Sequence, residues 1–179
     1  MPIAGIIASS NQQARASSFY QISQLSPSAV STVTFSSIPA TYKSLQVRYN
    51  LVASNPTSGF GFTFNGDSSS ANYVSHYLYG TGATVGSGGV ASGTWGYNVV
   101  NHGGLVTTYP NVGILDIIDY ANTNKNKVTK TLSGGNNDTA GGTIDMDSGI
   151  WLNTAAITSI TMAPNAGTFT GTISLYGAN

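Results

Sequence analysis

The sequence predicts an all-β protein: an antiparallel two-sheet sandwich, jelly-roll-like, with an extended N-terminal arm. Short segments alternate apolar and polar residues with a period of two, and Gly and Asn residues separate them. No window sustains the apolar spacing of a capped helix. About ten such strands in roughly 160 residues suit two packed sheets. We therefore expect residues 19–179 to form the sandwich and residues 1–18 to form the arm.

The alternation predicts where the strands lie. Leu45, Val47, Tyr49 and Leu51 alternate with polar residues, which is typical of a strand buried on one face. Val112 begins a run that is almost continuously apolar up to residue 120, so we expect a central strand covered on both faces. The other predicted strands span residues 30–35, 60–64, 73–79, 95–99, 127–132, 144–152, 157–162 and 170–176.

Turn residues mark the connections between these strands. Asn65-Gly66-Asp67 follows an aromatic strand and predicts a tight turn. Residues 80–93 and 133–142 consist largely of small residues and Asn, and we expect both to be flexible surface loops. The one helical feature that we expect is a short turn near residues 154–156.

The composition narrows the class of function. Charged residues make up 7% of the chain, against about 25% in typical domains, and the net charge is zero. A neutral chain has no electrostatic attraction to nucleic acid or to an anionic membrane, so we expect neither as a partner. Because the sequence has no Cys, disulfides and thiolate chemistry are excluded. Such low charge favours self-association and suits a subunit that its neighbours cover.

The first eighteen residues differ from the rest of the chain. They contain the apolar residues Ile3, Ile6 and Ile7, followed by a polar run and Arg15. We find neither the basic start nor the apolar core of a signal peptide, and no stretch approaches the roughly 18 apolar residues of a membrane span. We therefore expect a cytoplasmic chain whose arm is either a frayed terminus or a segment that orders on a partner.

The residues give little support for catalysis. His76 and His102 are the only histidines, and no Gly-x-Ser-x-Gly elbow accompanies them. Asp145 and Asp147 share one face of a predicted strand, where paired carboxylates could serve a glycosidase, but we favour a solvated strand edge or a hydrogen-bonded turn. We therefore expect no enzyme and assign no catalytic residue.

The sequence gives equally little support for a metal site or an anion site. We expect no cofactor and no metal, and calcium is the ion for which the loops offer the most oxygen ligands. Lys125, Lys127 and Lys130 form a small basic cluster that we interpret as a solvated face. The residues that could bind calcium, none of them in EF-hand spacing, are Asn65, Asp67, Asn136, Asn137, Asp138, Asp145 and Asp147.

Aromatic residues provide one binding hypothesis. Trp95 and Tyr97, together with Tyr73, Tyr77 and Tyr79, could form a platform for stacking sugar rings, as in carbohydrate-binding modules. The alternative, which we favour, is that these rings pack in the core or against neighbouring subunits.

A series of motifs runs through nearly the whole chain. It includes Phe62-Thr-Phe-Asn-Gly-Asp67 and Leu175-Tyr-Gly177, together with segments 7–10, 35–42, 45–48, 71–73, 78–80, 114–125, 149–151 and 156–161. In these motifs the chain resembles a family of tailed-bacteriophage virion structural proteins, of the capsid-decoration or fibre-like β-sandwich kind. The resemblance implies a structural role, and it implies no catalytic residue.

We therefore expect a non-enzymatic virion structural protein, assembled in the host cytoplasm and located in the virion. Within that class we favour a capsid decoration (cement) protein or a head-fibre subunit, attached through Ile3, Ile6, Ile7 and Arg15. The alternative is a tail-associated or a receptor- or glycan-binding module that uses Trp95 and Tyr97. The expected partners are the major capsid protein or tail and fibre proteins, and further copies of this chain, with a trimer as our guess.

Overall fold

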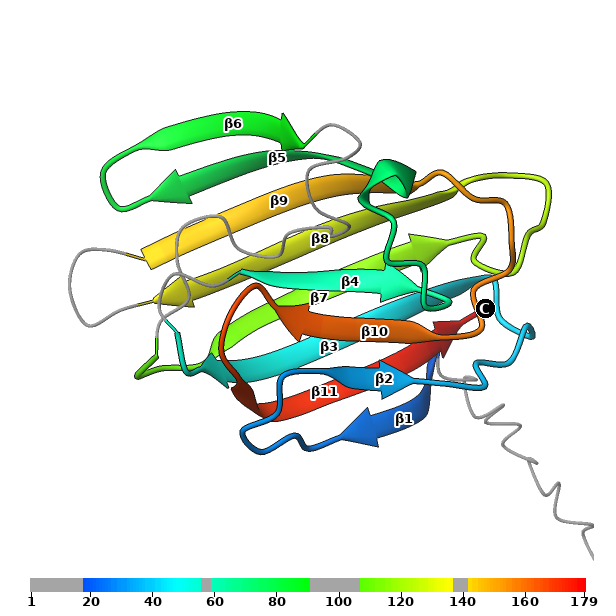
Figure 1. Cartoon of the computed structure of the whole chain (residues 1–179), viewed down its shortest axis with the longest axis horizontal. Helices are drawn as coiled ribbons and strands as arrows, with labels where there is room; N and C mark the ends of the chain where they lie inside the picture. The colour runs from blue at the N-terminus through cyan, green and yellow to red at the C-terminus, as the bar shows by residue number, and fades with distance from the viewer. Residues whose placement is uncertain (1–17, 56–58, 91–106, 137–141) are drawn as a thin grey trace, which may run out of the picture.

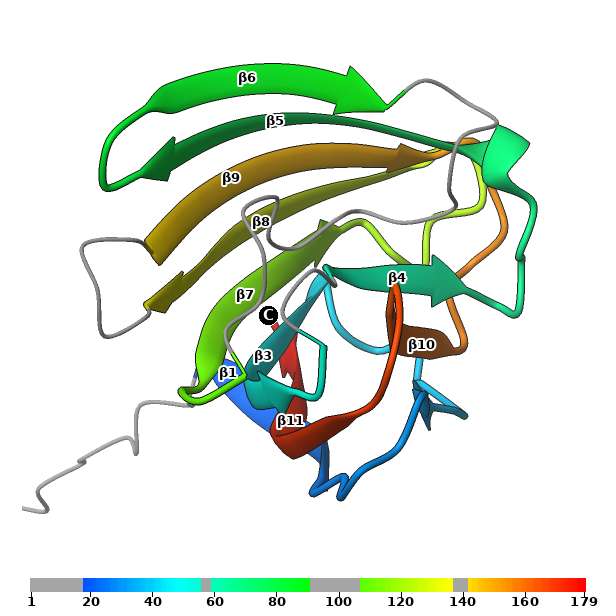
Figure 2. The same ribbon diagram turned by 60° about the vertical axis from the view of Figure 1, so that its left-hand side comes forward.

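The computed structural model describes residues 18–55, 59–90, 107–136 and 142–179. Within these ranges the chain forms two antiparallel sheets that pack face to face (Figures 1 and 2). The predicted all-β, two-sheet antiparallel sandwich is therefore confirmed, and its sheets are unequal, with eight and three strands. The single helix of the described residues is the short 3-10 turn η1 (Ser70–Asn72), so no helix there is long and apolar enough to span a membrane.

Eight strands form the larger sheet, in the order β1 (Phe19–Leu25), β11 (Phe169–Ala178), β3 (Ser44–Ala53), β7 (Asn111–Ile118), β8 (Lys127–Asn136), β9 (Gly142–Trp151), β5 (Tyr73–Thr81) and β6 (Val85–Val90). The smaller sheet has the order β2 (Val33–Phe35), β10 (Ile160–Pro164) and β4 (Phe60–Phe64). The first and last strands in sequence, β1 and β11, pair side by side, with Phe19 opposite Ala178. The first strand of the sandwich therefore begins at residue 19, directly after the predicted arm.

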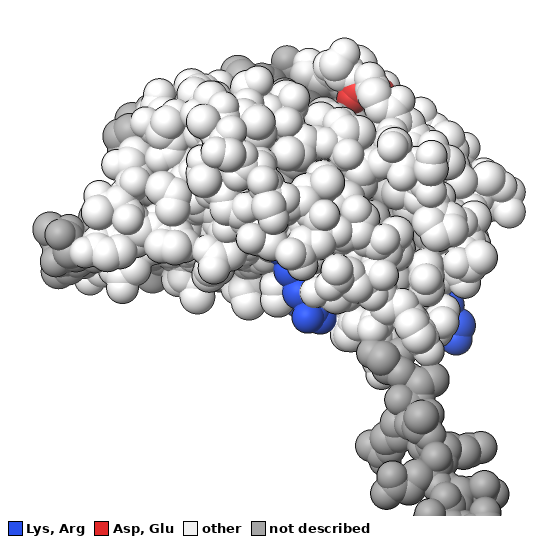
Figure 3. Space-filling model, turned by 90° about the horizontal axis from the view of Figure 1, so that it is seen from below, with Lys and Arg blue, Asp and Glu red and all other residues white. Residues whose placement is uncertain are grey.

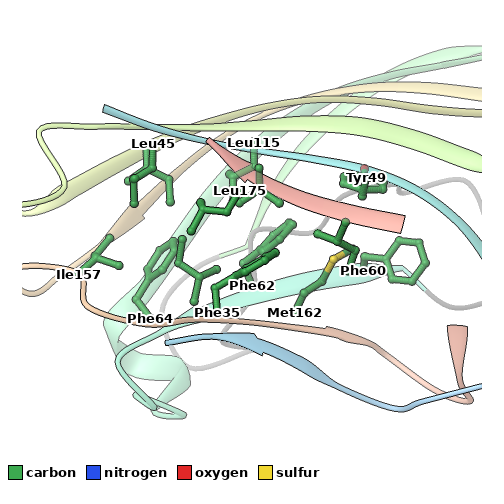
Figure 4. Packing of buried hydrophobic residues seen from close by; sticks show 14 of the residues in the cluster. Phe35, Leu45, Tyr49, Phe60, Phe62, Phe64, Leu115, Ile157, Met162 and Leu175 are labelled. Atoms are coloured by element: carbon green, nitrogen blue, oxygen red, sulfur yellow. The ribbon is translucent and has the colours of Figure 1, made fainter. Parts of the chain in front are cut away.

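The hydrophobic core lies between the two sheets (Figure 4). In β3 the residues at 45, 47, 49 and 51 are buried while Arg48 and Asn50 are exposed, as the alternation predicted. Phe60, Phe62 and Phe64 of β4 face them from the smaller sheet and are fully buried. Full burial of a phenylalanine contributes about 1.5–3 kcal/mol to stability, so this one short strand supplies a large part of the attraction between the sheets.

The predicted turn at Asn65-Gly66 is confirmed. Both residues adopt the left-handed conformation, with φ of 53° and 70°, and the Asp67 N–H donates a 2.9 Å hydrogen bond to the Phe64 carbonyl oxygen. Asn and Gly tolerate this conformation better than other residues, which explains the pair at this position. The turn carries the chain from β4 of the smaller sheet towards β5 of the larger one.

The prediction that residues 80–93 form a flexible loop is wrong for the described part of this segment. Residues 85–90 form β6, which pairs with β5 along its whole length. Tyr77 and Tyr79 of β5 lie opposite Gly88 and Gly86, and a Cβ atom at either glycine would collide with the facing ring. The tyrosine rings supply the packing surface that a glycine-rich strand lacks, so this strand forms despite its composition. Likewise, Ser133–Asn136 of the second predicted loop extend β8.

Two further predictions need correction. The strand that was expected to be covered on both faces, β7, is central but buried on its inner face alone. Val112, Ile114 and Ile118 point to the other side and are 51%, 38% and 62% exposed. The short helical turn expected at residues 154–156 is also not found, because this described segment is irregular and the turn occurs at η1. The uncovered face of β7 belongs to a larger apolar surface.

Candidate functional site

Two groups of predicted site residues lie outside the described residues. The arm residues Ile3, Ile6, Ile7 and Arg15 belong to residues 1–17, and Trp95 and Tyr97 belong to residues 91–106. The role of the arm in binding and that of these two aromatic residues in sugar stacking therefore stay predictions.

The other members of the predicted aromatic platform pack within the sheet. Tyr73 is buried, and its hydroxyl donates a 2.9 Å hydrogen bond to the carbonyl oxygen of Asp67. Tyr77 and Tyr79 are half-buried, their ring centroids lie 6.3 Å apart, and they cover the glycines of β6. These three tyrosines therefore stabilise the fold, which agrees with the packing role that we favoured.

Asp145 and Asp147 form a buried acidic pair on the inner face of β9. Their exposed fractions are 1% and 2%, so the prediction of a solvated strand edge is wrong. In this strand Thr143 and the two aspartates point inward, while Ile144 and Met146 point outward. Strand β8 shows the same inversion, with hydroxyl side chains inward and apolar ones outward. This half of the larger sheet therefore has a polar interior and an apolar exterior.

The neighbours of the acidic pair are mostly hydroxyl groups. Asp147 lies opposite Thr131 and Tyr77 in the two adjacent strands. Burial, and to a smaller extent the negative charge of Asp145, raise the pKa of Asp147 to about 8. In the described part of the chain, neither the Asp147 carboxyl oxygens nor the Thr131 hydroxyl has a hydrogen-bond partner. The pair can therefore hold a proton at neutral pH.

The candidate calcium ligands are not brought together. The side chain of Asn65 accepts a 2.8 Å hydrogen bond from the Thr158 N–H and donates one of 2.8 Å to the Ala156 carbonyl oxygen, so its polar atoms are used structurally. Asn137 and Asp138 lie outside the described residues. In the ranges that the structure describes, no group of three His, Cys, Asp or Glu side chains could hold a metal ion.

The predicted basic cluster does not form either. Lys127 is completely buried, whereas Lys125 and Lys130 are exposed. The Lys127 ammonium donates hydrogen bonds to the carbonyl oxygens of Asn122, Lys125 and Thr154, the last two at 2.7 and 3.0 Å. Burial lowers the pKa of Lys127, and the negative charge of Asp119 opposes this effect. The residue joins the loop between β7 and β8 to the loop between β9 and β10, and does not form part of a charged surface.

The outer face of the larger sheet, which points away from the smaller sheet, is unusually apolar. We define the outer apolar face by its exposed members from β5, β7, β8 and β9. Individually they are between 38% and 62% exposed. These eight exposed apolar side chains come from four adjacent strands, and large apolar patches on a monomer mark interaction sites. These members are Leu78, Val112, Ile114, Ile118, Val128, Leu132, Ile144 and Met146.

Strand register arranges this face in rows, because opposite residues on antiparallel strands share a face. Two apolar rows flank one polar row, and each row crosses β7, β8, β9 and β5 in that order. The apolar rows are Ile114, Leu132, Met146, Leu78 and Ile118, Val128, Ile150, Val74, and the polar row between them is Asp116, Lys130, Ser148, His76.

Charge is also sparse on the side of the molecule that Figure 3 shows, where blue and red atoms occupy only small, separate areas. The outer apolar face includes a groove of about 520 Å³ lined by Leu78, Ile118, Val128 and Met146, with Asp116 and Lys130 of the polar row. The strongest candidate for a functional surface is therefore this face, although the apolar run from residue 112 to residue 120 predicted burial for part of it.

The chain matches no protein-family model, no curated protein and no solved structure in the comparisons made. A function for this chain is therefore inferred from its own residues and geometry and from the resemblance in its sequence.

Proposed function

We propose that this chain is a non-enzymatic structural subunit of a tailed-bacteriophage virion, either a capsid decoration (cement) protein or a head-fibre subunit that attaches through residues 1–18. The observation that carries the proposal is the outer apolar face of the larger sheet. A surface of this size and composition is typical of a protein interaction site. An assembled particle would cover it, whereas a free monomer with so little charge would leave it in water.

The low charge of the chain supports the same proposal. Only 7% of its residues are charged, and the net charge is zero. Solubility of an isolated domain usually depends on a larger net charge. Apolar and hydrogen-bonded contacts between subunits do not require such charges, so the composition fits a protein that works inside an assembly. The resemblance of the sequence motifs to tailed-bacteriophage virion proteins is the reason for proposing a phage virion as this assembly.

The proposal is tested on intact particles. Immunogold labelling and mass spectrometry of purified virions should detect the chain in many copies, and its absence from them would contradict the proposed function. A chain that lacks residues 2–18 should retain the circular dichroism spectrum of a β protein but should not join particles. Normal incorporation of this shortened chain would contradict the attachment through the arm while leaving the structural role in place.

A further inference from the structure

We propose that the outer apolar face binds the same face of a second copy of this chain, around a two-fold axis that runs along the strands between β8 and β9. This inference rests on the proposed function in one respect: the outer apolar face is the observation behind that function, and the inference names the partner that covers this face. It departs from the trimer that the sequence suggested, since a face-to-face pair has two-fold symmetry.

The size of the face agrees with a stable pair. Its eight exposed apolar members come from four adjacent strands in each copy, and a standard protein–protein interface buries roughly 800 Å² per partner. Sheets that pack face to face lie about 10 Å apart with interdigitating side chains, and this is the geometry already used between the two sheets of the sandwich. The inversion of β8 and β9 leaves their apolar side chains exposed, and a second copy would cover them with an apolar layer of its own.

The position of the axis follows from the distribution of the apolar residues. They span β7, β8, β9 and β5, which are consecutive in the sheet, so the centre of the face lies between β8 and β9. Rotation about this axis places β8 over the partner's β9 and β7 over the partner's β5. Leu132 then faces the partner's Met146, and Ile114 faces the partner's Leu78. Each apolar row is therefore matched with an apolar row.

The polar row is also self-complementary in this arrangement. Asp116 faces the partner's His76, and Lys130 faces the hydroxyl of the partner's Ser148. Asp116 lies opposite Lys130 in its own sheet and accepts a 2.6 Å hydrogen bond from Gln46, so its carboxylate is already oriented. Each copy contributes one carboxylate, one ammonium and one imidazole to the row, and each Asp116 carboxylate faces a partner's imidazole and not a like charge.

The first test is the mass of the full chain in solution. Sedimentation equilibrium should show a dimer at micromolar concentration. Leu132→Asp places an unpaired charge at the centre of the contact and should weaken the dimer by roughly 30-fold or more. Thr172→Asp is the matched control, because it adds the same charge on β11, three strands away from β8 in the sheet and outside the proposed contact. It should leave the dimer unchanged. Circular dichroism of both variants checks that the fold is retained.

The second test fixes the position of the axis and exploits the absence of cysteine from the chain. A mixture of Ile114→Cys and Leu78→Cys proteins should be joined rapidly by a short bismaleimide, because these two positions face each other across the axis. Either protein alone should react much more slowly, because the two copies of its cysteine lie three strands apart. A wild-type chain that is monomeric or trimeric, or cross-linking of either single protein that is as fast as that of the mixture, would overturn the inference. If such a monomer still joined virions normally, the proposed function would stand while the pairing failed.

Discussion

The indole Nε1–H of Trp151 donates a 2.7 Å hydrogen bond to Oδ2 of Asp67, and this bond joins the end of β9 to the turn that follows β4. The Asn72 side chain donates a second hydrogen bond to the same oxygen, at 2.8 Å. Tyr73, the first residue of β5, donates its hydroxyl to the Asp67 carbonyl oxygen. One aspartate thus connects the smaller sheet with two strands of the larger one.

Replacement of Asp67 by alanine should destabilise the fold. Burial opposes ionisation of this carboxyl, but the hydrogen bonds from Trp151, Asn72 and Ser69 outweigh it and lower the pKa of Asp67. Its contribution is therefore present above the unfolded pKa of about 3.9 and is lost as the pH falls below that value. At pH 7 we expect Asp67→Ala to cost about 2–3 kcal/mol in urea unfolding.

The bond to Trp151 can be isolated by a double-mutant cycle. Trp151→Phe removes the indole N–H and keeps an aromatic ring in the core, where this residue is 1% exposed. If the hydrogen bond contributes directly, the two substitutions should couple by about 1–2 kcal/mol at pH 7. Strictly additive effects would show that Asp67 acts mainly through the loop residues.

The buried Lys127 should be required for stability although it forms no ion pair with a carboxylate of the described residues. Lys127→Met retains the length of the side chain and removes the three hydrogen bonds to loop carbonyl oxygens. We expect a loss of about 2 kcal/mol in the free energy of unfolding, since some of these carbonyl groups lose their partner. Lys125→Met is the control: its ion pair with Asp119 is exposed, so its loss should cost less than about 1 kcal/mol. Equal effects of the two changes would show that the hydrogen bonds of Lys127 to the loop carbonyl oxygens do not stabilise the fold.

Gly113 should not tolerate alanine. It lies opposite Tyr49 in the adjacent strand, and a Cβ atom would overlap the hydroxyl and the ring of this buried tyrosine. Because the core is closely packed, we expect Gly113→Ala to cost about 1–3 kcal/mol in thermal or urea unfolding. Tyr49→Leu should remove most of this additional cost when the two changes are combined. Gly80→Ala, whose Cβ would have its nearest neighbour at 3.5 Å, should be nearly neutral.

Local patterns in the sequence were sufficient to predict the sandwich. Alternation located β3 and β4, and the Asn65-Gly66 pair located the turn between the sheets. The glycine-rich β6 was missed, because its packing comes from tyrosines of the neighbouring strand and not from its own residues. Period-two alternation also gives no information on which face of a strand points inward, so the inversion in β8 and β9 could not be predicted.

The candidate surface was missed for a related reason. Apolar residues on both faces of residues 112–118 indicated burial on both faces, and one of those faces is uncovered in the single chain. The same pattern is produced by burial within a monomer and by burial against a partner. Asp145 and Asp147 were expected in water because aspartates are rarely buried, yet both lie at buried positions of β9.

Asp147 should make the stability of the protein depend on pH in the neutral range. Its pKa is raised to about 8 in the folded chain, by burial and by the charge of Asp145, and is about 3.9 in an unfolded chain. Between these values the folded state binds more protons than the unfolded state. The free energy of unfolding should therefore fall as the pH rises from about 4 to about 8, and then level off.

Asp147→Asn tests this directly, because the amide has nearly the same shape and cannot ionise. The variant should resemble the wild type near pH 4, where the stability loss caused by ionisation has barely begun, and should be the more stable protein at pH 9. Urea unfolding at pH 4, 7 and 9 measures both effects. Asp119→Asn serves as the control, since it removes a carboxylate that is exposed in its ion pair with Lys125. An Asp147→Asn protein that loses stability with pH as steeply as the wild type would place the titrating group elsewhere in the chain.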